Sequence, residues 1–279
     1  MRRHCFASPI LPITAWLLAA LVCGCASPPA PISGLEADTA AHVLALPPAD
    51  VVLLGEQHDA AEHQHIHQQV VASFAQRGRL AALAVEMADR GHSTTSLPRE
   101  ATAAQVQAAL TWDLKGWPWS AYGPAVMTAV RAGVPVLGAN LPRSRMREAM
   151  GNRRLDDHLP DAALQTQRQA IRTGHCGMLP ESQIGPMARI QIARDMAMAE
   201  TIAEAAVPGK VVVLMAGSGH VDRGLGVPQH LPPTLKVQAV RLLAGGSPAE
   251  AATAFDTVWP TPALPEKDYC ADMKQQMGG

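Results

Sequence analysis

The stretch VVLLGEQHD, residues 51–59, decides the predicted fold of this 279-residue chain. Its four apolar residues end at Gly55 and lead directly to Glu56 and His58. A short apolar run closed by a turn signal is typical of a buried strand in a parallel sheet, where ligands gather beyond the carboxyl ends of the strands. Because residues i and i+2 of an extended chain point the same way, Glu56 and His58 can face one cavity.

Two later segments repeat this arrangement. Residues 80–85 lead into Glu86, and the apolar run 211–216 leads into GSGH, residues 217–220. If the three strands are parallel neighbours, two carboxylates and two imidazoles converge at one edge of the sheet. These side chains belong to Glu56, His58, Glu86 and His220. The pattern therefore predicts a shared site built from residues far apart in the sequence.

Strand and helix patterns alternate along the rest of the chain. Further strands are predicted at 134–138 and 235–240, with a short one at 255–259, and helices at 59–76, 121–132 and 187–206. This alternation predicts an α/β fold with a mainly parallel β-sheet flanked by helices.

Two intervals are too long for simple crossovers. Residues 89–125 and 141–185, in approximate bounds, are expected to form a smaller helical subdomain within the domain 46–243. The segment 244–279 is rich in Pro and Ala and is expected to be an irregular tail.

The N-terminus has the layout of a secretory signal peptide. Two arginines precede an apolar segment that is too short for a membrane span, which predicts a signal peptide over 1–24. The sequence VCGC, residues 22–25, fits a bacterial lipobox with Cys25 as the lipidated residue. Cys23 is a second choice, and an ordinary signal peptide is the alternative. Residues 25–45 would then form a lipid anchor and Pro-rich linker, and the lack of an aspartate after Cys25 indicates the outer membrane.

The charge balance argues against nucleic-acid binding, and the cysteine content predicts a disulfide. Removal of residues 1–24 takes away Arg2 and Arg3 and leaves 21 basic against 24 acidic residues, so no basic face for nucleic acid is expected. If Cys25 carries lipid, the remaining thiols are Cys176 and Cys270. An even pair in an oxidising compartment predicts one disulfide, with two free thiols as the alternative.

Histidines are concentrated just after the first strand. On a helix His63 and His67 share one face, whereas His65 points nearly opposite, towards solvent. The pattern lacks the acid of a helical zinc-protease motif, and His63, one turn from the strand end, is best placed to reach the cleft. Ser218 lacks the flanking glycine pattern of a hydrolase nucleophile and is interpreted as structural.

Several separate motifs together resemble one family. They are LGEQHD (54–59), AVEM (84–87), Trp119 and Tyr122 with Pro124, GANLPR (138–143), RDMAMA (194–199) and GSGHV (217–221). In this order, over nearly the whole mature chain, they are similar to the ChaN-like haem-binding lipoproteins. That family lies within a superfamily that also holds erythromycin-esterase-like hydrolases and Tiki-type metalloproteases.

The resemblance implies haem bound at a surface where two protomers sandwich stacked porphyrins. It implies a tyrosine axial ligand, and the chain has only Tyr122 and Tyr269. A phenolate suits ferric iron and a storage or transfer role. Packing at the base of the helical subdomain is the alternative for Tyr122. The residues expected at the haem site are Glu56, His58, His63, Glu86, Tyr122 and His220, with Tyr122 and His220 as iron ligands.

Two features bear on how haem would be held. The family pattern leads us to expect adjacent histidines at the start of the first helix, but His63 is followed by Gln64. No C-x-x-C-H motif occurs, so haem would be bound non-covalently. Trp112, Trp117 and Trp119 either wall the porphyrin or anchor the core.

Two functions follow from these patterns. The first is a haem-binding lipoprotein for haem or iron uptake, transfer or storage, facing the periplasm or cell surface. Its partners would be an outer-membrane haem receptor or periplasmic acceptor, and haem binding would produce a homodimer. The alternative is a hydrolase in which the Glu/His cluster activates water, with or without a divalent metal. A purely structural envelope protein leaves the convergent acids and histidines unexplained.

Overall fold

The structure is a computed structural model that describes residues 34–246 and 253–277. The predicted signal peptide, the lipidation site at Cys25 and its alternative Cys23 lie outside the described residues. None of the helices in the described part is long and apolar enough to cross a membrane.

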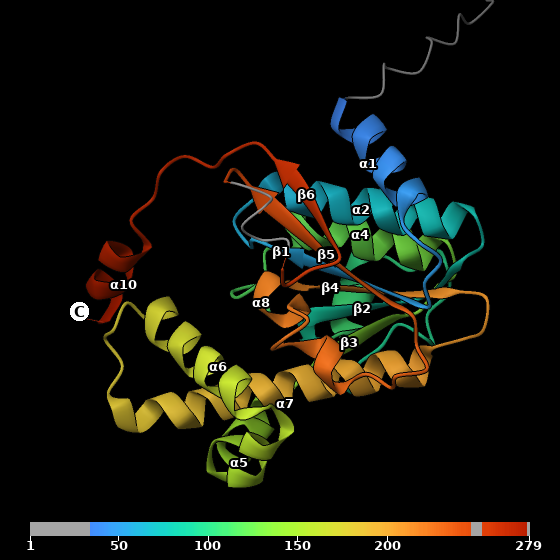
Figure 1. Ribbon diagram of the computed structural model, residues 1–279. Coiled ribbons are helices and arrows are strands. Elements are labelled where there is room, and N and C mark those ends of the chain that lie inside the picture. Colours follow the sequence, from blue (N-terminus) through green and yellow to red (C-terminus); the bar gives the residue numbers. More distant parts are fainter. Residues whose placement is uncertain (1–33, 247–252, 278–279) are drawn as a thin grey trace, which may run out of the picture. The chain divides into compact units, whose positions relative to one another are not determined.

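A six-stranded, fully parallel sheet forms the centre of the fold (Figure 1). The strand order is β3-β2-β4-β1-β5-β6, so the three strands that carry the predicted site are neighbours. The α/β class predicted from the sequence is confirmed. The strands are β1 (Val51–Glu56), β2 (Leu80–Asp89), β3 (Val136–Asn140), β4 (Val211–Gly217), β5 (Val237–Ala244) and β6 (Thr257–Thr261).

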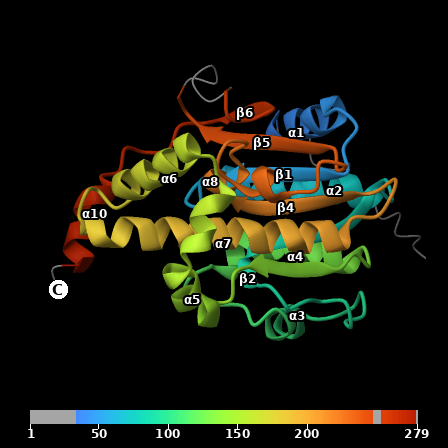
Figure 2. The same ribbon diagram turned by 60° about the horizontal axis from the view of Figure 1, so that its bottom comes forward.

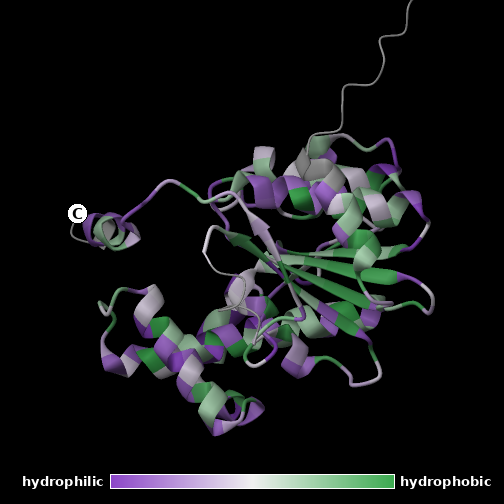
Figure 3. Ribbon diagram, turned by 45° about the horizontal axis from the view of Figure 1, so that its top comes forward, coloured by the Kyte–Doolittle hydropathy of each residue, from purple (hydrophilic) through white to green (hydrophobic). Residues whose placement is uncertain are grey.

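Helices cover both faces of the sheet, which explains why the central strands are continuously apolar. The helices α1 (Gly34–Ala45), α2 (Ala61–Gln76) and α4 (Trp119–Arg131) lie on one face (Figure 1). The long helix α7 (Glu181–Ala205) crosses the other face (Figure 2). Figure 3 shows the strands as the most hydrophobic elements, between helices whose outer faces are polar.

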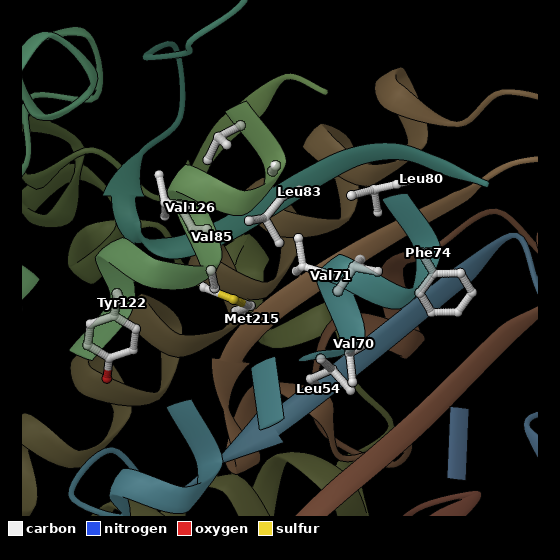
Figure 4. Close-up of a cluster of buried hydrophobic side chains, with 14 of the residues drawn as sticks. Leu54, Val70, Val71, Phe74, Leu80, Leu83, Val85, Tyr122, Val126 and Met215 are labelled. Atoms are coloured by element: carbon white, nitrogen blue, oxygen red, sulfur yellow. The ribbon is translucent and has the colours of Figure 1, made fainter. Parts of the chain in front are cut away.

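Alternate residues of β1 enter separate cores on the two faces. Val52 and Leu54 pack with residues of α2 and α4, whereas Val51 and Leu53 pack with Met198 of α7 and its neighbours. Figure 4 shows part of the first core, in which Tyr122 packs together with apolar side chains of the sheet and of α2. The period-2 alternation of a strand thus sends successive residues of one segment to opposite sides.

The predicted helical subdomain divides into two parts. Helix α3 (Ala103–Ala109) and α4 share the main core with the sheet. Residues 143–174 form η1 (Arg143–Arg145), α5 (Met146–Gly151), η2 (Arg153–His158) and α6 (Asp161–Gly174). These last elements pack against α7 around small apolar clusters of their own.

Three local features differ from the predictions. The helix predicted at 59–76 begins at Ala61, with Ala60 as its N-cap and no side-chain bond to its start. The predicted linker is helical from Gly34 onwards. The tail is less irregular than expected, since it contains the helix α10 (Tyr269–Met277) in addition to the predicted short strand, which is β6.

A disulfide joins Cys176 and Cys270, whose Cα atoms lie 5.7 Å apart. It attaches α10 to the segment between α6 and α7. The tail is also held at its Tyr269 hydroxyl, which donates a 2.5 Å hydrogen bond to Asp59.

Candidate functional site

Glu56 forms the centre of a buried polar cluster on the α2/α4 side of the sheet. Its Oε1 accepts hydrogen bonds from the Tyr122 hydroxyl at 2.6 Å and from Nδ1 of His58 at 2.7 Å. Its Oε2 accepts a longer bond of 3.3 Å from the amide of Gln64. His67 lies behind, with Nδ1 3.5 Å from Oε2 of Glu56 and neither ring nitrogen hydrogen-bonded. The carboxylate is therefore held by donors from three elements.

The environment sets the protonation states of this cluster. Burial raises the pKa of Glu56, but the hydrogen bonds from His58 and Tyr122 outweigh it, so the pKa lies below the usual 4.5. Burial also raises the pKa of Tyr122 far above 10, and the negative charge of Glu56 adds to this. Tyr122 is consequently a neutral phenol and Glu56 an ionised carboxylate.

A second buried cluster lies on the α7 side of the sheet. His220, in the short helix α8 (Ser218–Val221), lies between two acids. Its Nδ1 is 2.6 Å from Asp195 of α7, and its Nε2 is 3.4 Å from Glu86 of β2. Glu86 also accepts a 2.8 Å hydrogen bond from the backbone N–H of Gly217. The result is a carboxylate–imidazole–carboxylate triad.

These contacts shift the pKa values of all three groups. Burial lowers the pKa of His220, but the charges of Glu86 and Asp195 raise it overall to about 10. Burial opposes ionisation of Glu86, yet the charge of His220 and the hydrogen bond between them lower its pKa to about 2. Burial raises the pKa of Asp195 to about 6. His220 is therefore an imidazolium at neutral pH, with no lone pair to give to a metal.

His58 lies where the two clusters meet. Glu56 pairs in register with Gly217 across β1 and β4, and a Cβ atom on Gly217 would come within 2.8 Å of Nε2 of His58 and 3.7 Å of Glu86. Only glycine leaves room for this imidazole. Burial lowers the pKa of His58, but the Glu56 bond and the Glu86 charge raise it above 6.5 overall.

His58 is the accessible imidazole of the site. Its side chain is 44% exposed, and its Nδ1 is directed to Glu56. Among the described residues, Nε2 has no hydrogen-bond partner, which leaves that nitrogen available to a ligand. The Trp117 ring stands edge-on to the His58 ring at 5.0 Å between centroids, and at 5.7 Å from that of Tyr122.

Two cavities flank this point. One, of about 460 Å³, is lined by His58, the GSGH turn and the strand residues Arg241, Leu242 and Leu243. The other, of about 430 Å³, lies beside Glu86 and is lined by Trp117, Met87 and Met146, together with the cations Arg143 and Arg194. Such volumes are typical of small-molecule sites. Both linings are mixed, with many polar and charged side chains beside a few apolar ones.

The remaining predicted site residues have other surroundings. Both ring nitrogens of His63 are occupied, by the backbone N–H of Gln57 and by Thr261 of β6, and burial lowers its pKa to about 4. Tyr122 is only 2% exposed. Tyr269 is 46% exposed and bonds to Asp59, the neighbour of His58. The accessible phenol near the site is thus on the tail.

Sequence reasoning missed two partners. Asp195 lies in the quoted RDMAMA motif, but nothing in helical spacing showed that it would reach His220. Gln64 holds both Glu56 and the carbonyl of His58, a role that its position after His63 did not suggest. Among the described residues, no group of three or more His, Cys, Asp or Glu side chains is arranged to hold a metal ion.

The chain is similar to known haem-binding proteins. Residues 43–231 match the family described as haem-binding uptake, Tiki superfamily, ChaN. A solved structure described as cofacial heme binding to ChaN of Campylobacter jejuni is 25% identical, with a TM-score of 0.63 over 76% of this chain and 87% of that chain. The type III effector HopBA1 is 16% identical over 71% of this chain and 78% of its own, and its TM-score of 0.36 is too low to establish a common fold. No curated protein matches the sequence.

Proposed function

Because the chain belongs to the ChaN family of haem-binding uptake proteins in the Tiki superfamily, we propose that it binds haem non-covalently at the carboxyl edge of its sheet. The observation that carries this proposal is His58, an exposed imidazole whose Nδ1 is bonded to Glu56. Ligation of iron requires Nε2 without a proton, and a carboxylate on Nδ1 fixes the tautomer and ring orientation. Because the two glutamates raise the pKa of His58, iron has to displace the proton that Nε2 holds in the imidazolium.

The residues around His58 suit a flat, largely apolar ligand. Trp117 supplies an aromatic wall, and the two cavities supply methionine and leucine side chains on either side of the Glu56 and Glu86 clusters. A bound haem supplies a redox-active iron centre. The chain supplies a nitrogen ligand at His58, apolar cover and, through Glu56, control of the imidazole proton.

The two iron ligands predicted from the sequence, Tyr122 and His220, are not free to bind iron in this structure. His220 has both nitrogens engaged with acids, and the Tyr122 hydroxyl donates to Glu56 inside the core. For Tyr122 to bind iron, its phenol would have to leave Glu56 and lose its proton. Tyr269 would likewise have to leave Asp59 and lose its proton, but it is exposed and lies beside the residue that follows His58.

Titration of the purified protein with ferric haem tests this proposal. A shifted Soret band that saturates at or below one haem per chain is expected, and no shift would contradict haem binding. Tyr122→Phe and Tyr269→Phe are then compared with wild type. An altered spectrum for Tyr269→Phe alone would assign the second ligand to the tail, whereas an altered spectrum for Tyr122→Phe would show that the buried phenol moves.

The biological setting is part of the same proposal. We place the chain in the outer membrane through lipid on Cys25, with a role in haem uptake, transfer or storage and a homodimer when haem is bound. Radiolabelled palmitate incorporation that is lost in Cys25→Ser would support the anchor. A doubling of mass in solution on haem addition would support the dimer.

A hydrolase is the second function that a specific observation favours. Glu56 orients His58 as a carboxylate orients a general base, and the uncoordinated Nε2 faces a cavity. Hydrolysis of p-nitrophenyl esters that disappears in His58→Ala, with no haem binding by wild type, would favour this function. Haem binding without esterase activity would dismiss it.

A further inference from the structure

The cavity beside Glu86 is lined by a guanidinium with one buried N–H that has no hydrogen-bond partner among the described residues. Arg194 lies on α7 and lines this cavity of about 430 Å³. Its Nε atom is buried and has no hydrogen-bond partner among the described residues. A buried donor without a partner is unfavourable, so its persistence in a cavity points to a group that binds there.

The neighbouring acids are engaged elsewhere. Asp195, the next residue along α7, directs its carboxylate to His220 at 2.6 Å. Glu86 is bound by His220 and by the backbone of Gly217. Both carboxylates therefore already have a cationic or N–H partner.

The two other acids that line this cavity, Asp89 and Asp113, both interact with Arg143. Asp113 lies 3.8 Å from Arg143, and Asp89 accepts a 3.3 Å hydrogen bond from the Arg143 backbone N–H. Asp113 also accepts from the backbone N–H of Lys115 at 3.1 Å. The Arg143 side chain is 81% exposed, so it can turn towards the cavity mouth.

Trp117 connects this cavity with the proposed haem site. Trp117 lines it and also contacts the His58 ring, while Met87 and Met146 provide further apolar wall. We propose that Arg194, assisted by Arg143, binds a carboxylate carried on a flat apolar body placed against Trp117. Guanidinium groups bind carboxylates through paired, charge-assisted hydrogen bonds. This inference rests on the proposed function where the carboxylate is a porphyrin propionate, but a separate small carboxylate would use the same chemistry.

Haem and its dimethyl ester distinguish these sources. Wild type is expected to bind ferric haem about tenfold more tightly than the ester, as the loss of one charge-assisted hydrogen bond predicts. Arg194→Gln should lose this preference while its affinity for the ester is unchanged. Metal-free protoporphyrin, followed by quenching of tryptophan fluorescence, should show the same difference without any contribution from iron.

Control variants separate carboxylate binding from charge and folding. Arg147→Gln removes the same charge from an exposed position on α5 and should bind like wild type. Arg194→Lys keeps the charge but not the paired donors and should recover only part of the preference. Circular dichroism and thermal unfolding confirm that the variants are folded. If Arg194→Gln is unfolded, Arg143→Gln and the ester comparison on wild type carry the test.

A separate anion is tested with millimolar succinate. Succinate that raises the unfolding temperature of wild type but not of Arg194→Gln, with equal binding of haem and ester, would support Arg194 as a site for a free carboxylate. Equal haem and ester binding together with no succinate effect would overturn the inference, even if wild type binds haem. Absence of any Soret shift would instead remove the proposed function, and the succinate comparison would still decide on Arg194.

Discussion

Among single residues, Gly217 and the neighbouring acids Glu56 and Glu86 determine how the side chains of the site are arranged. The sequence predicted four converging side chains, and the structure brings them together around Gly217. They form two clusters, because Glu56 is bound by residues of α2 and α4 whereas Glu86 is bound by His220 of α8. Strand ends could be recognised from the sequence, but the helical partners Gln64 and Asp195 could not, and Tyr122 was expected at the site without its bond to Glu56. These contacts depend on packing.

The charge of His220 predicts a pH dependence of stability. Its pKa is raised from 6.5 to about 10, so its contribution is fully present below pH 6.5 and is lost as the pH rises through 10. The free energy of unfolding should fall by roughly 2 to 4 kcal/mol over this range, more steeply than in a His220→Gln variant. Urea unfolding at a series of pH values measures this. Parallel pH profiles for wild type and His220→Gln would contradict the assignment.

The lowered pKa of Glu86 predicts a loss of stability in acid. Its pKa is lowered from 4.5 to about 2, so the stability that it contributes is present above pH 4.5 and is lost as the pH falls towards 2. Glu86→Gln should therefore be less stable than wild type at pH 7, with a smaller difference near pH 2. Chemical denaturation at the two pH values measures the change. A difference independent of pH would show that packing, and not charge, is responsible.

Among the strands, one close backbone approach fixes the relative position of β2 and β3. Gly138 of β3 stands where a Cβ atom would lie 2.2 Å from the carbonyl oxygen of Asp89 on β2. That contact lies at the register shift between these strands. The apolar runs predicted each strand, but not this irregularity, because a bulge depends on pairing between two strands rather than on either sequence. The short strand of the tail was predicted, but its pairing with β5 and the helix α10 were not.

Gly138→Ala should be destabilising by about 1 to 3 kcal/mol, because the added methyl group meets backbone that cannot move without disturbing the pairing of β2 and β3. Thermal or urea unfolding measures the loss. Gly151→Ala is the matched control, since nothing lies within 4 Å of a Cβ atom there. If both variants unfold alike, the close approach at Gly138 does not constrain the fold.

At the scale of the whole molecule, the disulfide attaches a weakly packed tail to a well-packed body. Cys176 and Cys270 are 94 residues apart, but α10 is largely exposed. A cross-link over a long loop restricts the unfolded chain, yet breaking it also frees the tail in the folded state. Cys176→Ser with Cys270→Ser should therefore cost only about 1 to 3 kcal/mol.

Limited proteolysis should show the local part of this effect. Without the disulfide, cleavage should occur first within residues 262–277 and leave the remainder intact. Thermal unfolding of the double variant gives the global part. Unfolding of the whole chain before any cleavage of the tail would show that the disulfide supports the core instead.

In the proposed haem site, His58 presents its Nε2 to the iron and is held in place by Glu56. The most direct measurement is the haem affinity of His58→Ala compared with His65→Ala, both followed at the Soret band. We predict that His58→Ala binds haem at least about tenfold more weakly, with a changed spectrum, as expected for loss of an axial ligand, whereas His65→Ala matches wild type. Wild-type affinity and an unchanged spectrum in His58→Ala would contradict the account.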